Sequence, residues 1–349
     1  MTAVRFNAER PPGRPMAVLN VAFVGSQETA RSLAKLNDTR DLESYVHKVI
    51  DGDETKVLSL LRPLRHPERL APLLSVLNVA RCGIVEVAKI DAALGEVLVA
   101  FGSAGIEHGH LIIAPEEGGW VNPEQVRVIQ EQAGLGSWTL HEQPPSEHEL
   151  RDSLFELLDN LPSSVDEPLV IPVDQHFNVK GVGMVAIGYV QSGRVDKHQD
   201  LLVIPTSDKG VVRSLQVMDD DVDTAFAGDR VGVAFRNLRE GALGGGTLLV
   251  ALDVDGVGCA ETLTRHDVSR ITLHNAPFQN RSLEIGDILH GSVDLQFVVG
   301  RIEATSDNIL DIRWEQPLWI RREGGAPLIL AQLDSPMRIL GNATECNPL

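Results

Sequence analysis

The sequence predicts an α/β domain with a mostly parallel sheet, followed by two all-β barrel domains. From Met16 to about Leu161, apolar runs alternate with helical patterns, which is typical of a parallel sheet covered on both faces. The stretch NLPSSVDEP at 160–168 is polar and proline-flanked, and it ends this alternation. Beyond it, strand-like runs follow one another at the roughly 8–12-residue spacing of small barrels. A chain of 349 residues is also too long for one compact core.

The elements of the first domain, assigned to residues 16–161, follow from its apolar patterns. Residues 1–15 carry three prolines and no periodicity, so we expect a loose leader. The run AVLNVAFVG at 17–25 predicts a buried strand, followed by a helical pattern through Leu36. Ser146 and Glu149 have the spacing of a capping box at the start of the last helix. Further strands are expected at 55–61, 82–88 and 108–114, and helices at 68–80, 90–105 and 146–161.

Two all-β regions follow, at residues 168–252 and 253–345. In the first, strand-like runs are separated by the turn sequences SGR, TSDKG and AGDR, as expected of a small β-barrel. The second has its own series of strand-like runs, among them VSRITLHN, FVVGRIEA and PLILAQL. The aspartates of 219–223 are expected to form a solvated loop, because they lack the glycine and terminal glutamate of a calcium loop.

The net charge argues against one class of function and is spread unevenly. Forty-nine acidic and 31 basic residues give −18 at pH 7, which disfavours a chain-wide polyanion binder, so no DNA partner is expected. Residues 1–167 hold 25 acids and 15 bases, whereas residues 168–252 hold 10 and 8. The first barrel is therefore the least repulsive place for a nucleic acid. The bases are mostly arginine, which fits either a salt-adapted protein or a mildly acidic mesophilic one, and stability against salt separates the two.

Membrane and secreted classes are not expected. No run of about 18 apolar residues occurs, and the first 15 residues lack the apolar stretch of a signal peptide. Cys82, Cys259 and Cys346 lie far apart and outside any CxxC pair. This spacing fits a reducing compartment and no zinc finger, so we expect a cytoplasmic protein.

The histidines do not predict a metal site. His108 and His110 could share one face of a strand, but no third ligand is visible, so a plain strand pair is the favoured interpretation. His141 and His148 lie on a polar stretch and are expected to be solvated. No Ser/His/Asp or Cys/His pattern indicates a nucleophile, so no catalytic residue is expected.

The segment from Val170 to Gly183, VIPVDQHFNVKGVG, resembles the start of the second domain of translational GTPases. Elongation factor Tu, elongation factor 1-alpha and the selenocysteine-specific elongation factor share that opening. The match continues in order through 188–205, 211–235 and 245–249. More weakly, Gly286-Asp287 and the run MRILG near the end resemble the third domain of the same family. The resemblance implies that residues 16–161 form a P-loop-like GTPase domain.

The resemblance places a phosphate loop, GxxxxGK[ST], after the first strand, where this chain reads GSQETARS. In such a loop glycines let backbone N–H groups approach phosphate, the lysine reaches the β/γ oxygens and the hydroxyl binds Mg²⁺. Gly25 and Ser32 match that pattern. Ala30 adds a Cβ where backbone must come close, and Arg31 puts a planar cation that suits exposed phosphates in place of the lysine. Glu28 adds a negative charge.

Two further motifs of the family are also altered. Where DxPGH follows the third strand, this chain reads LRPLRH at 61–66, without the acid that lies near Mg²⁺. Where NKxD reads guanine, it has APEE at 114–117. Since Mg²⁺ and nucleophile positioning supply the catalysis, we expect no cofactor, with GTP or GDP plus Mg²⁺ as the alternative. The predicted vestigial nucleotide site consists of Gly25, Ala30, Arg31, Ser32 and Glu117.

In the family, the second domain grips the acceptor end of aminoacyl-tRNA, so the resemblance implies a translation-related protein that binds tRNA or the ribosome. Two basic groups are candidate RNA or partner contacts, with a plain surface face and a barrel edge as their alternatives. For the whole chain three hypotheses stay open: a static binder or regulator, an active GTPase with an unorthodox loop, and a protein-interaction module without RNA contact. The candidate contacts are Arg62, Arg65 and Arg69 near the switch position, and Arg321 and Arg322 beside Trp314 and Trp319.

Overall fold

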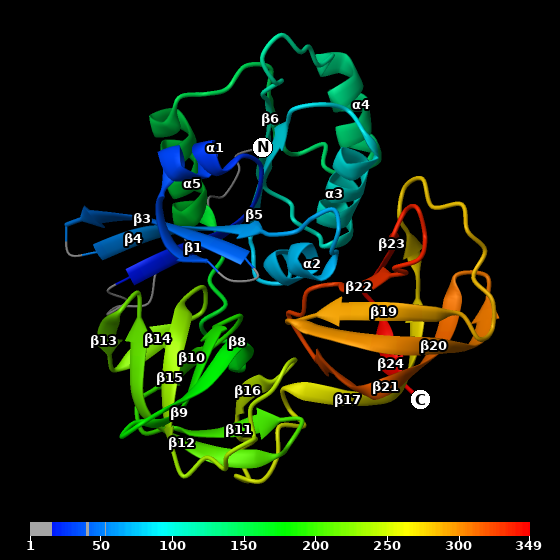
Figure 1. The fold of residues 1–349 in the computed structure, drawn as a ribbon. Helices are drawn as coiled ribbons and strands as arrows, with labels where there is room; N and C mark the ends of the chain where they lie inside the picture. Colours follow the sequence, from blue (N-terminus) through cyan, green and yellow to red (C-terminus); the bar gives the residue numbers. More distant parts are fainter. Residues whose placement is uncertain (1–15, 40–41, 53) are drawn as a thin grey trace, which may run out of the picture.

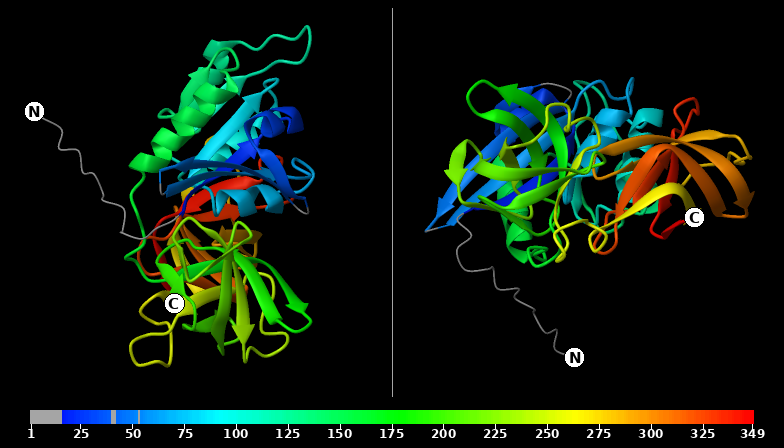
Figure 2. Two further views of the ribbon diagram at one scale, coloured as in Figure 1. Left: turned by 90° about the vertical axis from the view of Figure 1, so that its left-hand side faces the viewer. Right: turned by 90° about the horizontal axis from the view of Figure 1, so that it is seen from below.

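The computed structural model describes residues 16–39, 42–52 and 54–349, which form three domains (Figure 1). An α/β domain lies above two β-barrels, and Figure 2 shows from below that the barrels stand side by side. The expected leader, residues 1–15, lies outside the described residues. The predicted succession of one α/β domain and two barrels is confirmed.

The α/β domain is built on a seven-stranded sheet in the order β2-β3-β4-β1-β5-β6-β7. β4, β1, β5, β6 and β7 run parallel, whereas β2 and β3 join antiparallel at one edge. The prediction of a mostly parallel sheet is therefore confirmed. The strands are β1 (Met16–Val24), β2 (Lys35–Thr39), β3 (Leu42–Asp51), β4 (Glu54–Pro63), β5 (Cys82–Val87), β6 (Gly109–Ile113) and β7 (Thr139–His141).

Helices cover both faces of this sheet because its central strand, β1, is apolar on both sides. Successive side chains of a strand point to opposite faces. Leu19 and Phe23 pack with α1 and α5, while Ala22 packs with α2 and α3 on the other face. No helix of the described residues combines the length and the apolar character that a membrane span requires. The helices are α1 (Gln27–Leu33), α2 (Ala71–Leu77), α3 (Ala92–Ser103), α4 (Pro123–Gln132) and α5 (Glu147–Asn160).

The sequence-based assignment of this domain is right for the apolar elements and wrong or silent for the polar ones. The helical pattern expected through Leu36 ends at Leu33, because Lys35 and Leu36 already pair with β3 as part of β2. β2, β3, α4 and β7 are missing from the prediction. β2 is a partly exposed edge strand, and α4 buries only two side chains, so neither gives an apolar run. The capping box of Ser146 and Glu149 at the start of α5 is confirmed.

The first barrel closes as a ring of strands in the order β11-β16-β8-β9-β15-β12, with β12 pairing back to β11. A Cβ at residue 188 would lie 2.4 Å from the carbonyl oxygen of Pro172, so Gly188 is what lets β9 approach β8. The strands are β8 (Val170–Val179), β9 (Gly183–Tyr189), β11 (Asp200–Ile204), β12 (Asp208–Val217), β15 (Arg230–Arg236) and β16 (Leu248–Ala251), with the short β10 (Arg194–Asp196), β13 (Asp220–Val222) and β14 (Thr224–Phe226).

The second barrel is an eight-stranded sheet that bends round on itself. β17 pairs with β21, and its continuation β18 pairs with β23 at the other end of the strand order, which closes the ring. The final strand, β24, pairs with β17. The strands are β17 (Leu263–Thr272), β18 (His274–Asn275), β19 (Ile288–Val293), β20 (Gln296–Ser306), β21 (Ile309–Arg321), β22 (Leu328–Ala331), β23 (Ile339–Ala343) and β24 (Cys346–Pro348).

Apolar packing continues from the α/β domain into both barrels. One core cluster joins α2 and α3 to Ile329 and Ile339 of the second barrel. Another joins Met16 and Val18 of β1 to the strands of the first barrel. Domains of one chain move relative to each other unless their interface is large and apolar. The shared cores therefore hold the three domains as one body.

A buried ion cluster reinforces the contact between α3 and the second barrel. Arg338 donates hydrogen bonds from Nε (2.8 Å) and Nη2 to the two carboxylate oxygens of Glu96. Nε2 of His66 lies 3.1 Å from Glu96 Oε1. Burial raises the pKa of Glu96, but the hydrogen bonds from Arg338 and His66 outweigh it and lower the pKa to about 2. Glu96 is therefore ionised at neutral pH, inside the domain interface.

Replacing Arg338 by alanine should lower the free energy of unfolding by about 3 kcal/mol, because the Glu96 carboxylate stays buried without its main partner. The matched control is R270A, since Arg270 also bridges both oxygens of an aspartate, Asp311, in the same barrel. The Arg270 side chain is 54% exposed, so its loss should change stability little. The measurement is the urea midpoint of unfolding, and equal midpoints for the two variants would contradict the assignment.

Candidate functional site

The turn between β1 and α1 lies at the carboxyl edge of the parallel strands, where the vestigial nucleotide site is predicted. α1 begins at Gln27, and Ser26 caps it by accepting a hydrogen bond from the Thr29 N–H. A phosphate loop keeps several backbone N–H groups free for its ligand. Here the N–H groups of Ser26, Thr29 and Ala30 all have acceptors within the chain. Most of the expected loop is therefore helix.

The carboxylate of Glu86, near the end of β5, occupies the start of α1. One of its oxygens accepts the Ser26 N–H, and the other accepts the Thr29 hydroxyl. A Cβ at residue 25 would lie 2.5 Å from Glu86 Oε2, so Gly25 is what allows this approach. An anion is favourable beside the first turn of a helix, and here the chain supplies that anion itself. The arrangement does not fit a nucleotide phosphate at the same place, because its charge would meet that of Glu86.

A second carboxylate, that of the buried Glu43 of β3, holds the neighbouring segments together. It accepts hydrogen bonds from Gln27 Nε2 (2.8 Å), Tyr45 Oη (2.7 Å) and Arg62 Nη1 (3.0 Å). Arg62 also donates from Nε to the carbonyl oxygen of Gly25 (2.8 Å). Burial raises the pKa of Glu43, but the hydrogen bond from Tyr45 and the charge of Arg62 lower it overall. This carboxylate therefore binds α1, β3 and β4 together from inside.

The other residues of the predicted nucleotide site do not gather around Glu86. Ala30 is buried in the core between α1 and α5. Ser32 is exposed, and its hydroxyl donates to the carbonyl oxygen of Thr29 (2.9 Å). Arg31 is exposed in the last turn of α1, and Glu117 is exposed in the turn after β6. Of the five predicted residues, Gly25 is the one that lies against Glu86.

Of the five arginines predicted as RNA or partner contacts, two are partly buried and three are exposed. The Arg321 side chain is 6% exposed, and its guanidinium bridges both oxygens of Asp294 at 3.0 Å. Arg62 is held by Glu43, as described above. Trp314, predicted beside Arg321, is buried and donates to Ser269 Oγ, so its ring belongs to the barrel core. The exposed arginines are Arg65, Arg69 and Arg322.

The expectation that His141 is solvated is wrong, because β7 pairs with β6 and brings it beside His110. His110 Nδ1 lies 3.0 Å from His141 Nε2, and His110 is buried. Burial and the charge of His141 lower the pKa of His110 to about 4, so its ring is neutral at neutral pH. In the part of the chain that the structure describes, no three His, Cys, Asp or Glu side chains converge to hold a metal ion.

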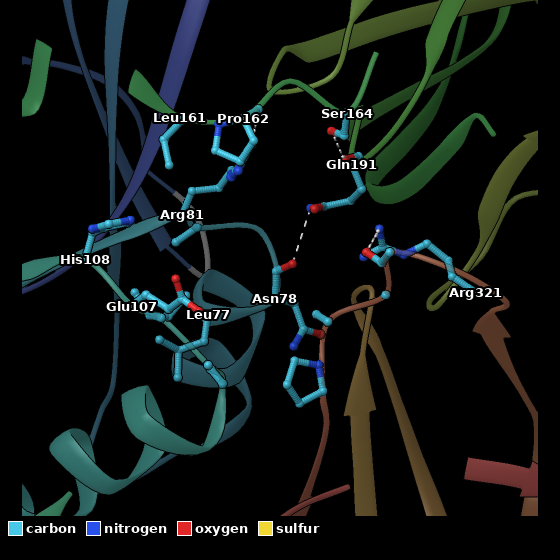
Figure 3. Close-up of a pocket in the computed structure, with 18 of the residues that line it drawn as sticks. Leu77, Asn78, Arg81, Glu107, His108, Leu161, Pro162, Ser164, Gln191 and Arg321 are labelled. Carbon is cyan, nitrogen blue, oxygen red and sulfur yellow. Dashed lines mark hydrogen bonds between the residues drawn. The ribbon is translucent and has the colours of Figure 1, made fainter. Parts of the chain in front are cut away.

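A pocket of about 400 Å³ lies where the three domains meet (Figure 3). Arg81 and His108, which precede β5 and β6, line it from the α/β domain. Gln191 lines it from the first barrel and Arg321 from the second. The linker at 161–164 completes the wall. The pocket lies at the amino edge of the parallel strands, opposite the edge that carries Glu86.

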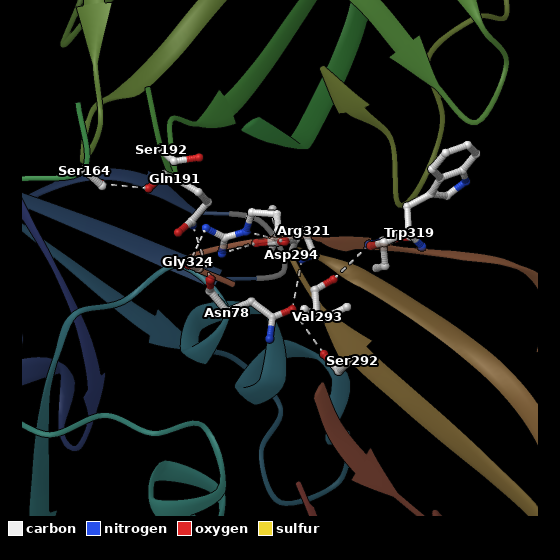
Figure 4. A network of polar contacts seen from close by, with 12 residues as sticks. Asn78, Ser164, Gln191, Ser192, Ser292, Val293, Asp294, Trp319, Arg321 and Gly324 are labelled. Atoms are coloured by element: carbon white, nitrogen blue, oxygen red, sulfur yellow. Dashed lines mark hydrogen bonds and ion pairs between the residues drawn. The ribbon is translucent and has the colours of Figure 1, made fainter. Parts of the chain in front are cut away.

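Asn78, the residue that follows α2, joins both barrels at the wall of this pocket (Figure 4). Its backbone oxygen accepts a hydrogen bond from Gln191 Nε2 (3.3 Å) of the first barrel. Its side-chain oxygen accepts from Ser292 Oγ (3.2 Å) and from the Leu295 N–H (2.9 Å) of the second. Asn78 is 5% exposed, and its bond to Ser292 is buried. One residue therefore contacts all three domains.

Neither Glu86 nor Asn78 is among the residues predicted from sequence. Glu86 has a local signal, since it is the one acid in the apolar strand CGIVEV and lies next to the strand that ends at the altered loop. Asn78 has no such signal, because its partners come from residues more than a hundred positions away.

Comparison with known proteins relates the first barrel to one family. The family model for elongation factor Tu domain 2 matches residues 183–249. An uncharacterized protein of Methanocaldococcus jannaschii is 28% identical over 93% of this chain and 99% of that protein. The selenocysteine-specific elongation factor of the same organism is 36% identical over 30% of this chain and 23% of its own length. Elongation factor 1-alpha of Sulfolobus acidocaldarius is 34% identical over 25% and 21%, so the chain matches less than a quarter of either elongation factor.

Solved structures share the fold over nearly the whole chain. Translation elongation factor SelB from Methanococcus maripaludis, in complex with the GTP analogue GPPNHP, superposes with a TM-score of 0.75. It is 20% identical, and the match covers 95% of this chain and 80% of that one. The apo form of the same factor gives a TM-score of 0.72 at 17% identity. At this level of identity the likeness concerns the fold.

Replacing Glu86 by alanine should lower the free energy of unfolding by about 1–3 kcal/mol, because the Ser26 N–H and the Thr29 hydroxyl lose their acceptor. E28A is the control, since Glu28 is exposed in the first turn of the same helix and should matter little. Urea unfolding of both variants is the measurement. An E86A variant as stable as the wild type would show that the carboxylate does not hold α1.

Replacing Asn78 by alanine should make the Leu295 amide exchange with solvent faster, because that N–H loses its acceptor. Hydrogen–deuterium exchange of the segment that carries Leu295 is the measurement. S292A is the matched control, since it removes the other donor to Asn78 and leaves the Leu295 bond intact. Unchanged exchange in N78A would mean that the junction does not depend on this side chain.

Proposed function

This chain belongs to the translational GTPase family as an elongation-factor-like protein, and we propose that it is a static binder or regulator associated with tRNA or the ribosome, without tight GTP binding or hydrolysis. The observation that carries the proposal is the Glu86 carboxylate at the start of α1. It supports the view that the phosphate position has been taken over by a group of the protein itself.

Glu86 competes with a nucleotide for the same hydrogen-bond donors. Because it is part of the chain, it is present at a high effective concentration. A phosphate that stayed beside it would face a repulsion of about 4 kcal/mol at 4 Å, for an effective dielectric constant of about 20. Glu43 lies on the same side through Gln27, but its charge is paired with that of Arg62. The charge of Glu86 is therefore the one that favours a domain without a triphosphate.

The groups that would hold Mg²⁺ and position a nucleophile are also not assembled. Leu61 stands where the DxPGH motif has its aspartate, and it is fully buried. Arg31 stands at the position of the motif lysine and Glu117 at that of the motif aspartate. Both are exposed, Arg31 in the last turn of α1 and Glu117 in the turn after β6. Phosphoryl transfer depends on positioning and on charge stabilisation by Mg²⁺. These placements support the absence of efficient hydrolysis.

The arrangement of the domains supports a static role. A switch needs two conformations and a ligand that binds one of them better. Here Asn78 and the Glu96–Arg338 pair join the α/β domain to the barrels with contacts supplied entirely by the chain. The first barrel, which matches elongation factor Tu domain 2, has a nearly balanced charge. Local RNA contact there is compatible with the acidity of the rest.

We expect fluorescent GTP and GDP analogues with Mg²⁺ to show no saturable binding at micromolar concentrations, because Glu86 already occupies the donors that phosphate would use. SelB from Methanococcus maripaludis, which has been crystallised with a GTP analogue, is the positive control. Saturation together with turnover would overturn the proposal in favour of an active GTPase.

The RNA half of the proposal is tested separately on the same protein. Crosslinking in cells, purification and sequencing of the recovered RNA should show enrichment of tRNA or ribosomal RNA. Absence of RNA at both low and high salt would favour a protein-interaction module, since electrostatic contacts with phosphates weaken only as salt rises.

A further inference from the structure

A basic pocket lies between the last turn of α1, the first residues of β2, and α5, at the opposite end of α1 from Glu86. Figure 1 shows α1 and α5 beside each other above the β3–β4 edge of the sheet. The pocket has a volume of about 380 Å³. The pocket shares Arg31 and Ser32 with the altered phosphate-loop motif, but it lies away from Glu86 and from the domain junction. Its lining includes Arg31, Leu33, Lys35, Leu36, His47 and Arg151.

The pocket concentrates positive charge on a domain with an excess of acids. Arg31 and Lys35 are exposed, and within the described part of the chain neither has an acidic partner at ion-pair distance. Arg151 adds a third positive charge and is only partly balanced by Glu147, whose oxygen lies 3.4 Å from its guanidinium. The side chains of Arg31 and Lys35 can therefore bind an anion, and Arg151 adds positive charge next to them.

The site is built on a fixed element, because Arg151 is anchored. Its guanidinium donates from Nε to the carbonyl oxygen of Leu33 (2.8 Å) and from Nη2 to that of Ser32. These are carbonyl groups that the end of a helix leaves unpaired. Arg151 therefore binds α5 to α1 and neutralises the negative end of the helix. Its side chain is 16% exposed, so it is a wall of the pocket that does not swing freely.

Apart from Ser32, the rest of the lining is apolar or aromatic. Leu33 is buried and Leu36 half-buried. The ring of His47 packs against Phe155, with 6.0 Å between ring centres. Burial and the nearby charge of Arg151 lower the pKa of His47, which is consistent with positive potential in the pocket. An anionic ligand with an uncharged flat part is therefore a better match than a bare ion.

We propose that this pocket binds the phosphodiester backbone of an RNA, with Arg31 and Lys35 on phosphates and the apolar lining under a ribose or base. Arg31 stands at the position of the phosphate-loop lysine, but the fold turns it outward to solvent. A guanidinium matches a phosphate with two parallel hydrogen bonds, and aromatic and apolar surfaces favour bases over the side chains of an acidic peptide. The choice of RNA rests on the proposed function, whereas the location rests on the pocket.

The test compares the wild type, R31A/K35A and a charge-matched control, K89A/R127A, in fluorescence anisotropy with a labelled oligouridine. Lys89 and Arg127 are exposed in the same domain but engaged in ion pairs with Asp91 and Glu124. We expect R31A/K35A to bind about twenty-fold more weakly at 0.1 M salt, because each phosphate contact on a single strand contributes a salt exponent of about 0.7. Its salt slope should fall by about 1.4, and the control should match the wild type.

Each other outcome has a defined meaning. Equal weakening of both double variants would show that only net charge matters and would overturn the pocket. Binding that neither variant changes would overturn the pocket and leave the proposed RNA association intact. A wild type that does not bind the oligouridine would overturn the pocket, whereas the proposed association with tRNA or the ribosome is decided by the RNA recovered from cells. If polyglutamate displaced the oligouridine as efficiently as unlabelled RNA does, the ligand of the pocket would be an acidic protein segment, and the proposal of RNA would be overturned. Unchanged thermal unfolding of R31A/K35A confirms that its fold is preserved.

Discussion

The two oxygens of Asn78 are the point at which the three domains meet, and the arrangement of the molecule depends on them. Both are buried acceptors whose donors belong to other domains. Breaking these hydrogen bonds is costly, because a buried acceptor left unpaired costs about 1–3 kcal/mol. The apolar clusters on either side add buried area to the interface, but they do little to fix the relative orientation of the domains, since hydrophobic contact is not directional. The hydrogen bonds of Asn78 therefore set the register in which the apolar surfaces meet.

The α/β domain combines the strand order of a nucleotide-binding sheet with an internal anion. Glu86 places a negative charge at the start of α1 and accepts hydrogen bonds there, so that end of the helix is stable without a ligand. Glu43 and Arg62 then fasten the neighbouring strands. The positive charge that the family resemblance assigns to this place has moved outward with Arg31. Two carboxylates, those of Glu86 and Glu43, thus lie near the start of α1, whereas Arg31 is exposed to solvent.

How much the sequence predicts depends on where the decisive contacts lie. Long apolar runs such as those of β1, β4 and β5 determine the parallel sheet, and their burial is local information. β2 escapes prediction because its polar residues, KLNDT, read as a continuation of the preceding helix until pairing with β3 is seen. The position of His141 is not predicted, because it depends on the pairing of β7 with β6, which brings His141 against His110. At the site, the altered motif falls on the turn between β1 and α1 and on α1 itself. The carboxylate that fills it comes from a strand some sixty residues later.

The close approach of Gly25 and Glu86 also makes the present state hard to leave by single substitutions. Restoring a lysine at position 31 or a glycine at position 30 would gain nothing while the carboxylate remains in place. Removing the carboxylate first would leave the Ser26 N–H and the Thr29 hydroxyl unpaired, before any phosphate could be held in compensation. Each single substitution toward the family motif is therefore neutral or unfavourable for this turn. A phosphate loop could be built here only by changing Glu86 together with positions 30 and 31.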